Sequence, residues 1–279
     1  MTTDSILLND GYYMPRPGCG LWLIDNRDVD SLIRQALKAG FRHFDTAQAY
    51  FNEDRVGRAL RYTEVPREQL FITSKIRGRD MGYARTLVSF NETLERLGVE
   101  YLELFLIHWP IPAKNLYVET WEASIELEAS GLIRSIGVSN FTCQHIERLI
   151  EDTGVVPAVN QLELHPHFQQ CDVRDYHHEA GIAIQSYSPF GSNGAAVLRN
   201  AVVMVLARRH DHSPAQIVLR WHLQQGLTPL PRTTNGARFS ENVDVWDFEL
   251  SEEEMKLLAS LNTRTGNTQP LPDAMNMSF

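Results

Sequence analysis

LELFLIHW (102–109) is an apolar run of strand length with a polar end, one of eight such runs in the chain. Each run is followed by a stretch whose apolar residues have helical spacing. Successive runs begin about 30 residues apart, the length of one strand with its returning helix. The other seven runs are GCGLWLI (18–24), FRHFDTA (41–47), LFITSKI (70–76), IRSIGVSN (133–140), PAVNQLEL (157–164), IAIQSYSP (182–189) and LTPLPR (227–232).

The segments between the runs carry signals of helix ends. Gly40 follows an apolar stripe and is expected to end that helix. Ser213 with Gln216 forms a capping box, and Ser251 begins a second one. The interval between the last two runs is the longest and has room for an extra helix at about 197–209.

Eight alternating pairs predict an α/β fold, a closed (β/α)₈ (TIM) barrel that occupies residues 1–279 as one domain. The stretch SILLNDGYYMP (5–15) has the Asn-Asp-Gly signal of a tight β-hairpin, which would plug the bottom of the barrel. One or two helices are expected beyond the eight repeats. An open doubly wound sheet is disfavoured because no G-x-G-x-x-G turn follows an early strand.

The chain is acidic, with 26 Lys and Arg against 35 Asp and Glu and a net charge of −9. This charge disfavours nucleic acid and anionic membranes as partners. The start MTTDSILLND (1–10) lacks a signal-peptide pattern, and no apolar run reaches the ~18 residues of a membrane helix. Cys19, Cys143 and Cys171 form neither a disulfide framework nor a zinc pattern, so we expect a cytoplasmic protein.

Polar side chains gather where the predicted strands end, which is where barrel enzymes carry their chemistry. Branched apolar residues normally fill a barrel interior, so a whole ring of polar groups indicates a site, although any one of them could be a packing residue. The ring comprises Asp45, Tyr50, Lys75, His108, Ser139, Asn140, Asn160, Gln161, Tyr187, Ser188 and Arg232.

Four members of this ring suit proton donation to a developing alkoxide. Tyr50 would be the acid, and a cationic Lys75 beside it would lower the pKa of the phenol. Asp45 would hold Lys75 in place, and His108 would polarise the substrate oxygen. Without a nucleophile or a metal, such a site suits hydride transfer from a bound cofactor to a carbonyl.

Seven stretches carry a family resemblance, in the family's order and near its spacing. They are GFRHFDTAQAY (40–50), ITSKI (72–76), LFLIHWP (104–110), GVSNF (137–141), PAVNQLELHP (157–166), SYSPFG (186–191) and LPRTTNGARFSEN (230–242). On these stretches the chain resembles the aldo-keto reductases, which are NAD(P)(H)-dependent (β/α)₈ barrels. The resemblance implies a catalytic tetrad with Tyr50 as general acid, formed by Asp45, Tyr50, Lys75 and His108.

The resemblance also implies a coenzyme site. Ser139, Asn140 and Gln161 would hold the nicotinamide carboxamide, and the ring of Tyr187 would stack on the nicotinamide, next to Ser188. Residues that would take the pyrophosphate and adenosine end are Arg232, Thr233, Thr234, Arg238 and Asn242.

Physical chemistry supports that assignment of the stretch 232–242. Hydroxyls and free N–H groups ahead of a helix suit an anion, and Arg238 adds a permanent charge near the 2′-phosphate of NADP. Arg232 and Thr233 replace the usual Lys and Ser of the family. NADPH remains the expected coenzyme, with NADH as the other candidate.

Three residues are expected at the substrate. Trp22 and Trp109 would line a largely apolar pocket for a small carbonyl compound. Arg77 stands where the family often has an aromatic wall, so we expect it to favour substrates with a negative group. The tail PLPDAMNMSF (270–279) would either fold over this pocket as an apolar lid or fray.

Three other functions are compatible with parts of the sequence. Glu163, His165 and His167 have E-x-H-x-H spacing that can hold zinc in a hydrolase, but no further ligand is evident. A glycosidase needs two facing carboxylates, and only Asp45 lies at a strand end. A nucleotide-binding barrel with a regulatory or redox-sensing role is the non-catalytic alternative. The sequence thus favours NADPH-dependent, metal-free reduction of aldehydes or ketones, and the family resemblance implies a monomer.

Overall fold

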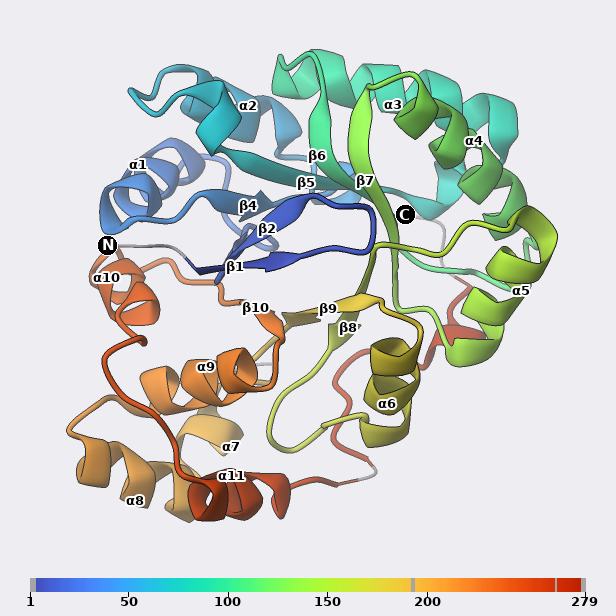
Figure 1. Cartoon of the computed structure of the whole chain (residues 1–279). Coiled ribbons are helices and arrows are strands. Elements are labelled where there is room, and N and C mark those ends of the chain that lie inside the picture. Colours follow the sequence, from blue (N-terminus) through green and yellow to red (C-terminus); the bar gives the residue numbers. More distant parts are fainter. Residues whose placement is uncertain (1–3, 192–193, 264, 277–279) are drawn as a thin grey trace.

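Eight parallel strands form the centre of the molecule (Figure 1). The computed structural model describes residues 4–191, 194–263 and 265–276. Strands adjacent in the barrel are also consecutive in the chain. They are β3 (Cys19–Gly20), β4 (His43–Asp45), β5 (Phe71–Ile76), β6 (Leu102–Ile107), β7 (Ile133–Ser139), β8 (Val159–Glu163), β9 (Ala183–Tyr187) and β10 (Thr228–Leu230).

Two backbone hydrogen bonds close the barrel between its first and last strands. The N–H of Gly18 donates to the carbonyl of Pro229 (3.0 Å), and the N–H of Gly20 donates to the carbonyl of Pro231 (3.1 Å). A Cβ at Gly18 would lie 2.5 Å from the side chain of Leu230, so the missing side chain permits this close approach. The predicted (β/α)₈ barrel is confirmed.

Helices cover the outside of the barrel (Figure 1). The capping boxes predicted at Ser213 and Ser251 are both formed, and Gly40 ends its helix with a left-handed backbone. The helices are α1 (Val29–Ala39), α2 (Glu53–Arg61), α3 (Tyr83–Leu97), α4 (Tyr117–Ala129), α5 (Cys143–Thr153), α6 (Cys171–Glu179), α7 (Ala195–Leu198), α8 (Ala201–His210), α9 (Pro214–Gln224), α10 (Ala237–Val243) and α11 (Glu252–Ala259).

The extra helix predicted at about 197–209 is two helices, α7 and α8. Asn200 separates them, because its side chain accepts a hydrogen bond from the Val202 N–H and so caps α8. The helix α11 is a further addition after β10 and α10.

An antiparallel hairpin of β1 (Asp4–Leu7) and β2 (Tyr13–Arg16) crosses the amino ends of the barrel strands. The predicted tight turn at Asn-Asp-Gly is formed: the Leu8 N–H donates to the Tyr12 carbonyl (2.9 Å), the Gly11 N–H donates back to the Leu8 carbonyl (3.1 Å), and Gly11 has a left-handed φ of 91°. Met14 is fully buried and packs into an interior apolar cluster with residues of the barrel strands. The hairpin therefore plugs the bottom of the barrel, as predicted.

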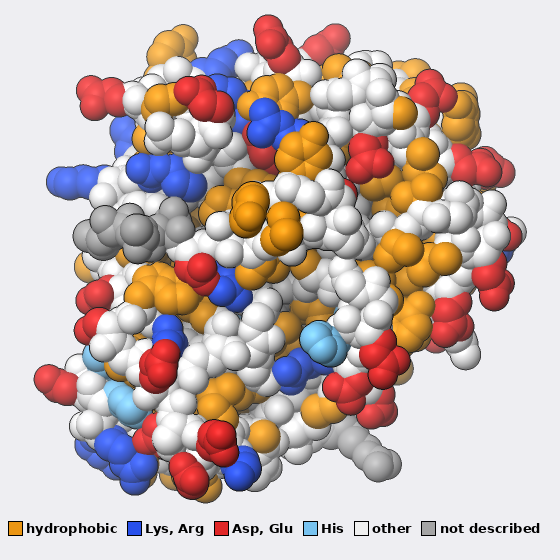
Figure 2. Space-filling view, in the orientation of Figure 1, with side chains coloured by type: hydrophobic (Ala, Val, Ile, Leu, Met, Phe, Trp, Pro, Cys, Tyr) orange, Lys and Arg blue, Asp and Glu red, His pale blue; other side chains and the backbone are white. Residues whose placement is uncertain are grey.

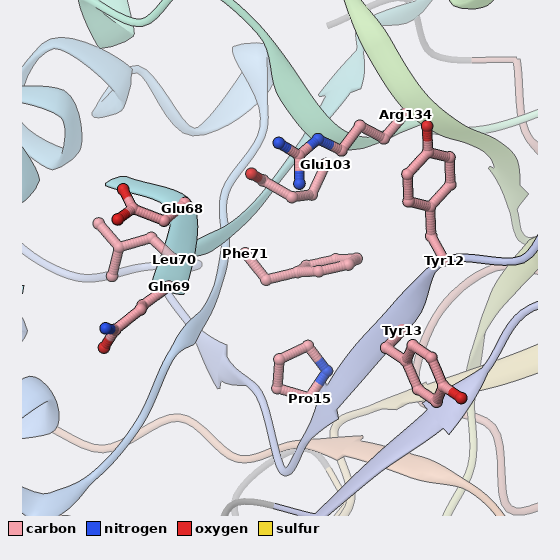
Figure 3. A pocket seen from close by; sticks show the side chains of 9 residues that line it. All are labelled: Tyr12, Tyr13, Pro15, Glu68, Gln69, Leu70, Phe71, Glu103 and Arg134. Carbon is pink, nitrogen blue, oxygen red and sulfur yellow. The ribbon is translucent and has the colours of Figure 1, made fainter. Parts of the chain in front are cut away.

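The hairpin face carries a cavity of about 100 Å³ between Tyr12, Tyr13 and Phe71 (Figure 3). Glu103 and Arg134 also line it, and both lie near the amino ends of their strands. Figure 2 shows the hairpin side of the surface, where basic side chains are interspersed with acidic ones. Because this cavity lies at the amino ends of the strands, it is separate from the chemistry predicted at their carboxyl ends.

Candidate active site

Asp45, Tyr50 and Lys75 meet at the carboxyl ends of β4 and β5. Asp45 ends β4, and Tyr50 ends the 3₁₀ turn η1 (Gln48–Tyr50) that follows. The Nζ of Lys75 donates to Asp45 Oδ1 (2.6 Å), to the Thr46 carbonyl (2.9 Å) and to the hydroxyl oxygen of Tyr50 (3.3 Å). Three such bonds use all the N–H groups of the ammonium, so its position is fixed.

Burial dominates the electrostatics of this cluster. It lowers the pKa of Lys75, against which Asp45 acts to keep the ammonium charged. It also raises the pKa of Tyr50 well above the usual 10, and the Asp45 carboxylate adds to that rise. The predicted net lowering of the pKa of the phenol is therefore wrong, because lost solvation and a nearby carboxylate outweigh the stabilising effect of the ammonium. Tyr50 keeps its proton at neutral pH.

His108 directly follows β6, and its ring lies edge-on to the ring of Tyr50, with centroids 5.7 Å apart. Burial and, to a lesser extent, Lys75 hold the pKa of His108 well below 6.5, so the imidazole is neutral. Its Nδ1 is buried and without a hydrogen-bond partner among the described residues. The four predicted catalytic side chains therefore form one cluster with an unsatisfied polar atom.

Asn140 joins the ends of β7 and β9 into one hydrogen-bonded group. Its backbone is left-handed (φ 62°), and its Nδ2 donates to the His108 carbonyl and to Ser139 Oγ, both at 3.0 Å. Its Oδ1 accepts from the Tyr187 hydroxyl (2.8 Å). Ser139 Oγ donates to the Gln161 carbonyl (3.0 Å). The predicted carboxamide-binding residues are thus brought together beside His108.

Gln161 links this group to the catalytic cluster. Its Nε2 donates to Asp45 Oδ2 (2.8 Å) and to Gln185 Oε1 (2.6 Å). Gln185, and His43 beyond it, are absent from the predicted ring of polar residues. The signal that could have found them is the period of two along a strand, which places His43 on the same face as Asp45 and Gln185 on the same face as Tyr187.

The predicted anion-binding stretch after β10 is mostly open to solvent. The exposed side chains are those of Arg232, Thr234 and Arg238, and the buried ones are those of Thr233 and Asn242. Arg232 Nη1 donates to the Leu23 carbonyl (3.3 Å), so this stretch contacts the loop that carries Trp22. Ser188 follows β9 with φ 47°, and its carbonyl accepts from the Gly191 N–H.

The predicted substrate residues differ in their surroundings. Trp22 is 42% exposed, whereas Trp109 is buried in the apolar core. Arg77 is also buried, and its Nε donates to Asp80, which accepts from Arg85 as well. Arg77 therefore does not present a free cation, because Asp80 lies three residues away in the turn η3 (Gly78–Asp80) and pairs with it, as it does with Arg85.

The region considered for zinc has a structural role. The Glu163 carboxylate accepts from the Thr268 N–H, the Thr268 hydroxyl and the Gln269 N–H, so it anchors the segment after α11. His165 and His167 border a cavity of about 380 Å³. In the described ranges of the chain, no group of three His, Cys, Asp or Glu could hold a metal ion.

The described part of the C-terminal tail is docked on the barrel. Met275 is buried in the main apolar cluster, and Asp273 lies 3.3 Å from His145 of α5. Met277 and Phe279, two further apolar residues of the predicted lid, lie outside the described residues. Within the part of the chain that is described, no helix is both long and apolar enough to span a membrane.

The fold and the cluster of Asp45, Tyr50, Lys75 and His108 define a barrel oxidoreductase whose chemistry lies at the strand ends. The aldo/keto reductase family model matches residues 17–263, and the chain belongs to this family.

Known proteins of the family resemble this chain along most of its length. An aldo-keto reductase of Mycolicibacterium smegmatis is 46% identical over 92% of this chain and 93% of its own. The methylglyoxal reductase DkgA of Escherichia coli O157:H7 is 44% identical, again over 92% and 93%. A crystal structure of a Gox0644 variant in complex with NADPH is 38% identical, covers 99% of this chain and 100% of its own, and superposes with a TM-score of 0.95.

Proposed function

We propose that this protein reduces aldehydes or ketones to alcohols with NADPH. One observation carries the proposal, namely the protonated phenol of Tyr50 held 3.3 Å from the buried ammonium of Lys75. Lys75 donates to the phenol oxygen, and no described residue accepts the phenol's own hydrogen. That hydrogen is therefore left for a substrate oxygen.

The residues around this cluster fit the coenzyme. The neutral His108 has an unsatisfied buried nitrogen, and Ser139, Asn140 and Gln161 supply amide and hydroxyl groups beside it. The exposed Arg232 and Arg238 offer charge to phosphates, and the hydroxyls of Thr233 and Thr234 and the amide of Asn242 offer hydrogen-bonding groups. A relative of known structure binds NADPH, which supports the same coenzyme here. When bound, NADPH supplies the hydride that the carbonyl carbon receives.

The chain itself supplies the proton. Tyr50 donates it to the substrate oxygen as the C=O group becomes an alcohol, and the Lys75 ammonium stabilises the phenolate that is left. Asp45 keeps Lys75 charged despite its burial, and a neutral His108 donates a hydrogen bond to the same oxygen. A positioned general acid is typically worth about 10²–10⁴ in rate.

The substrate class we propose is small aldehydes, including 2-oxoaldehydes, on the strength of the similarity to a methylglyoxal reductase. Trp22 and Trp109 would line the apolar side of the mouth. Arg77 would form a wall rather than a free charge, because its guanidinium is paired with Asp80. We further propose that residues 1–279 act as one domain, as a monomer, in the cytoplasm.

Turnover tests this proposal against a regulatory nucleotide-binding barrel. The purified protein is mixed with NADPH and either methylglyoxal or a nitrobenzaldehyde, and NADPH absorbance and the alcohol product are followed. We expect equimolar NADPH loss and alcohol formation, faster with NADPH than with NADH. Coenzyme binding without turnover of any aldehyde would favour the regulatory role.

A further inference from the structure

Four polar side chains form a continuous line inside the barrel beneath the catalytic cluster. Asp45 accepts from Gln161, Gln161 donates to Gln185, and Gln185 contacts His43. Gln185 and His43 are fully buried, in positions that branched apolar residues normally fill. Buried polar groups are retained at such positions only when their hydrogen bonds are satisfied.

The lower end of this line fixes the direction of its hydrogen bonds. Nδ1 of His43 lies 3.1 Å from the carbonyl oxygen of Pro15, which can only accept, so Nδ1 carries the hydrogen. Burial lowers the pKa of His43 to about 4, so the ring is neutral and Nε2 is an acceptor. The Thr73 hydroxyl (3.1 Å) and the amide nitrogen of Gln185 (3.4 Å) face that acceptor.

This tautomer sets the orientation of the two glutamine amides. Since the nitrogen of Gln185 faces His43 and the sulfur of Met14 (3.1 Å), its oxygen faces Gln161. Gln161 must then present its nitrogen to Gln185 and, with the second hydrogen, to Asp45. Both hydrogens of that amide are used inside the protein, and no described residue donates to its Oε1.

We infer that Gln185 is a positioning residue that locks the Gln161 amide with its oxygen free to accept from the carboxamide N–H₂ group of the nicotinamide. The inference rests on the proposed function, because it needs the coenzyme to bind at Gln161. Asp45 contributes the other restraint but is also bound to Lys75. Gln185 is therefore the partner of Gln161 that can be changed without removing a group from the catalytic cluster.

The test compares two coenzymes that differ at the carboxamide. NADP⁺ has the N–H₂ donor, and its 3-acetylpyridine analogue carries a methyl group in that place. Calorimetry on the full chain gives both Kd values without any turnover. We expect the wild type to bind NADP⁺ about fivefold more tightly than the analogue, the effect of about one hydrogen bond. In Gln185→Leu we expect the ratio of the Kd of the analogue to the Kd of NADP⁺ to fall below about twofold.

Two variants separate positioning from general damage. Gln185→Glu, when protonated, accepts from Gln161 and donates to His43, so the ratio is expected to stay near the wild-type value. Ser135→Ala removes a buried hydroxyl without a described partner from β7 and is expected to leave the ratio unchanged. If Gln185→Leu does not fold, Gln185→Met fills the same space with an unbranched side chain.

The outcomes distinguish the two proposals. A wild-type ratio that persists in the folded Leu or Met variant would overturn the role of Gln185 and leave the proposed function intact. A wild type that reduces aldehydes but binds both coenzymes equally would overturn the carboxamide contact of Gln161 and this inference with it. A wild type that binds neither coenzyme would contradict the proposed function as well.

Discussion

The two ends of the barrel interior are lined by different kinds of side chain, apolar at one end and polar at the other. At the amino ends of the strands, Met14 of the hairpin packs against Phe71, Leu104 and Val159 in an apolar cluster. At the carboxyl ends, Lys75 and its partners form a dense network of polar groups. The first arrangement excludes water and stabilises the fold, whereas the second keeps reactive groups in fixed positions. Substitutions at the two ends should therefore affect different measurements.

The largest expected effect comes from Lys75→Met at the polar end. It leaves Asp45 buried without its cation, which costs about 3–5 kcal/mol of unfolding free energy. It also removes the charge that stabilises the phenolate, so kcat should fall at least about 10²-fold. Urea unfolding and NADPH oxidation measure the two effects. The exposed Lys38→Met on α1 is the control and should change the unfolding free energy by less than about 0.5 kcal/mol.

At the apolar end, Leu104→Ala should lower the unfolding free energy and leave kcat nearly unchanged. Removing this fully buried side chain should cost about 2–5 kcal/mol of unfolding free energy, while kcat at a temperature where the variant is folded stays within about twofold. The exposed Leu257→Ala on α11 is the matched control for denaturant unfolding. A large loss of kcat in folded Leu104→Ala would contradict the division between the two ends.

His43 lies between the two ends and predicts a pH dependence of stability. Burial lowers its folded-state pKa to about 4, below the ordinary 6.5, so the unfolded chain binds the proton more readily. The contribution of His43 to the unfolding free energy is complete above pH 6.5 and is lost as the pH falls towards 4. This loss amounts to at most about 3 kcal/mol. Denaturant unfolding from pH 7 to 4 should show a shallower decline for His43→Leu than for the wild type. Parallel declines would show that His43 does not titrate this way.

A smaller effect is expected at the mouth of the barrel, where Arg77 is paired with Asp80. Arg77→Ala should change the ratio of kcat/KM for succinic semialdehyde and butanal by less than about twofold. Asp80→Asn uncovers the charge and should raise the ratio about threefold in favour of the anionic aldehyde. A strong loss of anionic preference in Arg77→Ala would restore the idea of a free cation.

Sequence patterns predicted the barrel well because each strand and helix is a local, repeated signal. All eight runs contain barrel strands, but GCGLWLI (18–24) provides only Cys19–Gly20. After Gly20 the chain leaves the sheet, although the Leu21 N–H still donates to the Asp45 carbonyl. Strand length depends on which neighbours a strand finds, and local patterns do not contain that information.

The sequence predicted which residues form the candidate site, but it did not predict how their pKa values shift. Residues at strand ends can be read from the sequence, and so the cluster around Tyr50 was found. The direction of its pKa shift depends on burial, which only the folded chain defines. The pairing of Arg77 with Asp80 and the line through Gln185 depend on side-chain orientation within a turn and inside the barrel.

The most direct test of the central claim is Tyr50→Phe, which keeps the ring and removes the acid. The exposed Tyr62→Phe serves as the control. With a saturating aldehyde, kcat of Tyr50→Phe should fall at least about 10²-fold, while the Kd for NADPH stays within about twofold. A variant that keeps most of the wild-type kcat would contradict the role of Tyr50 as the proton donor.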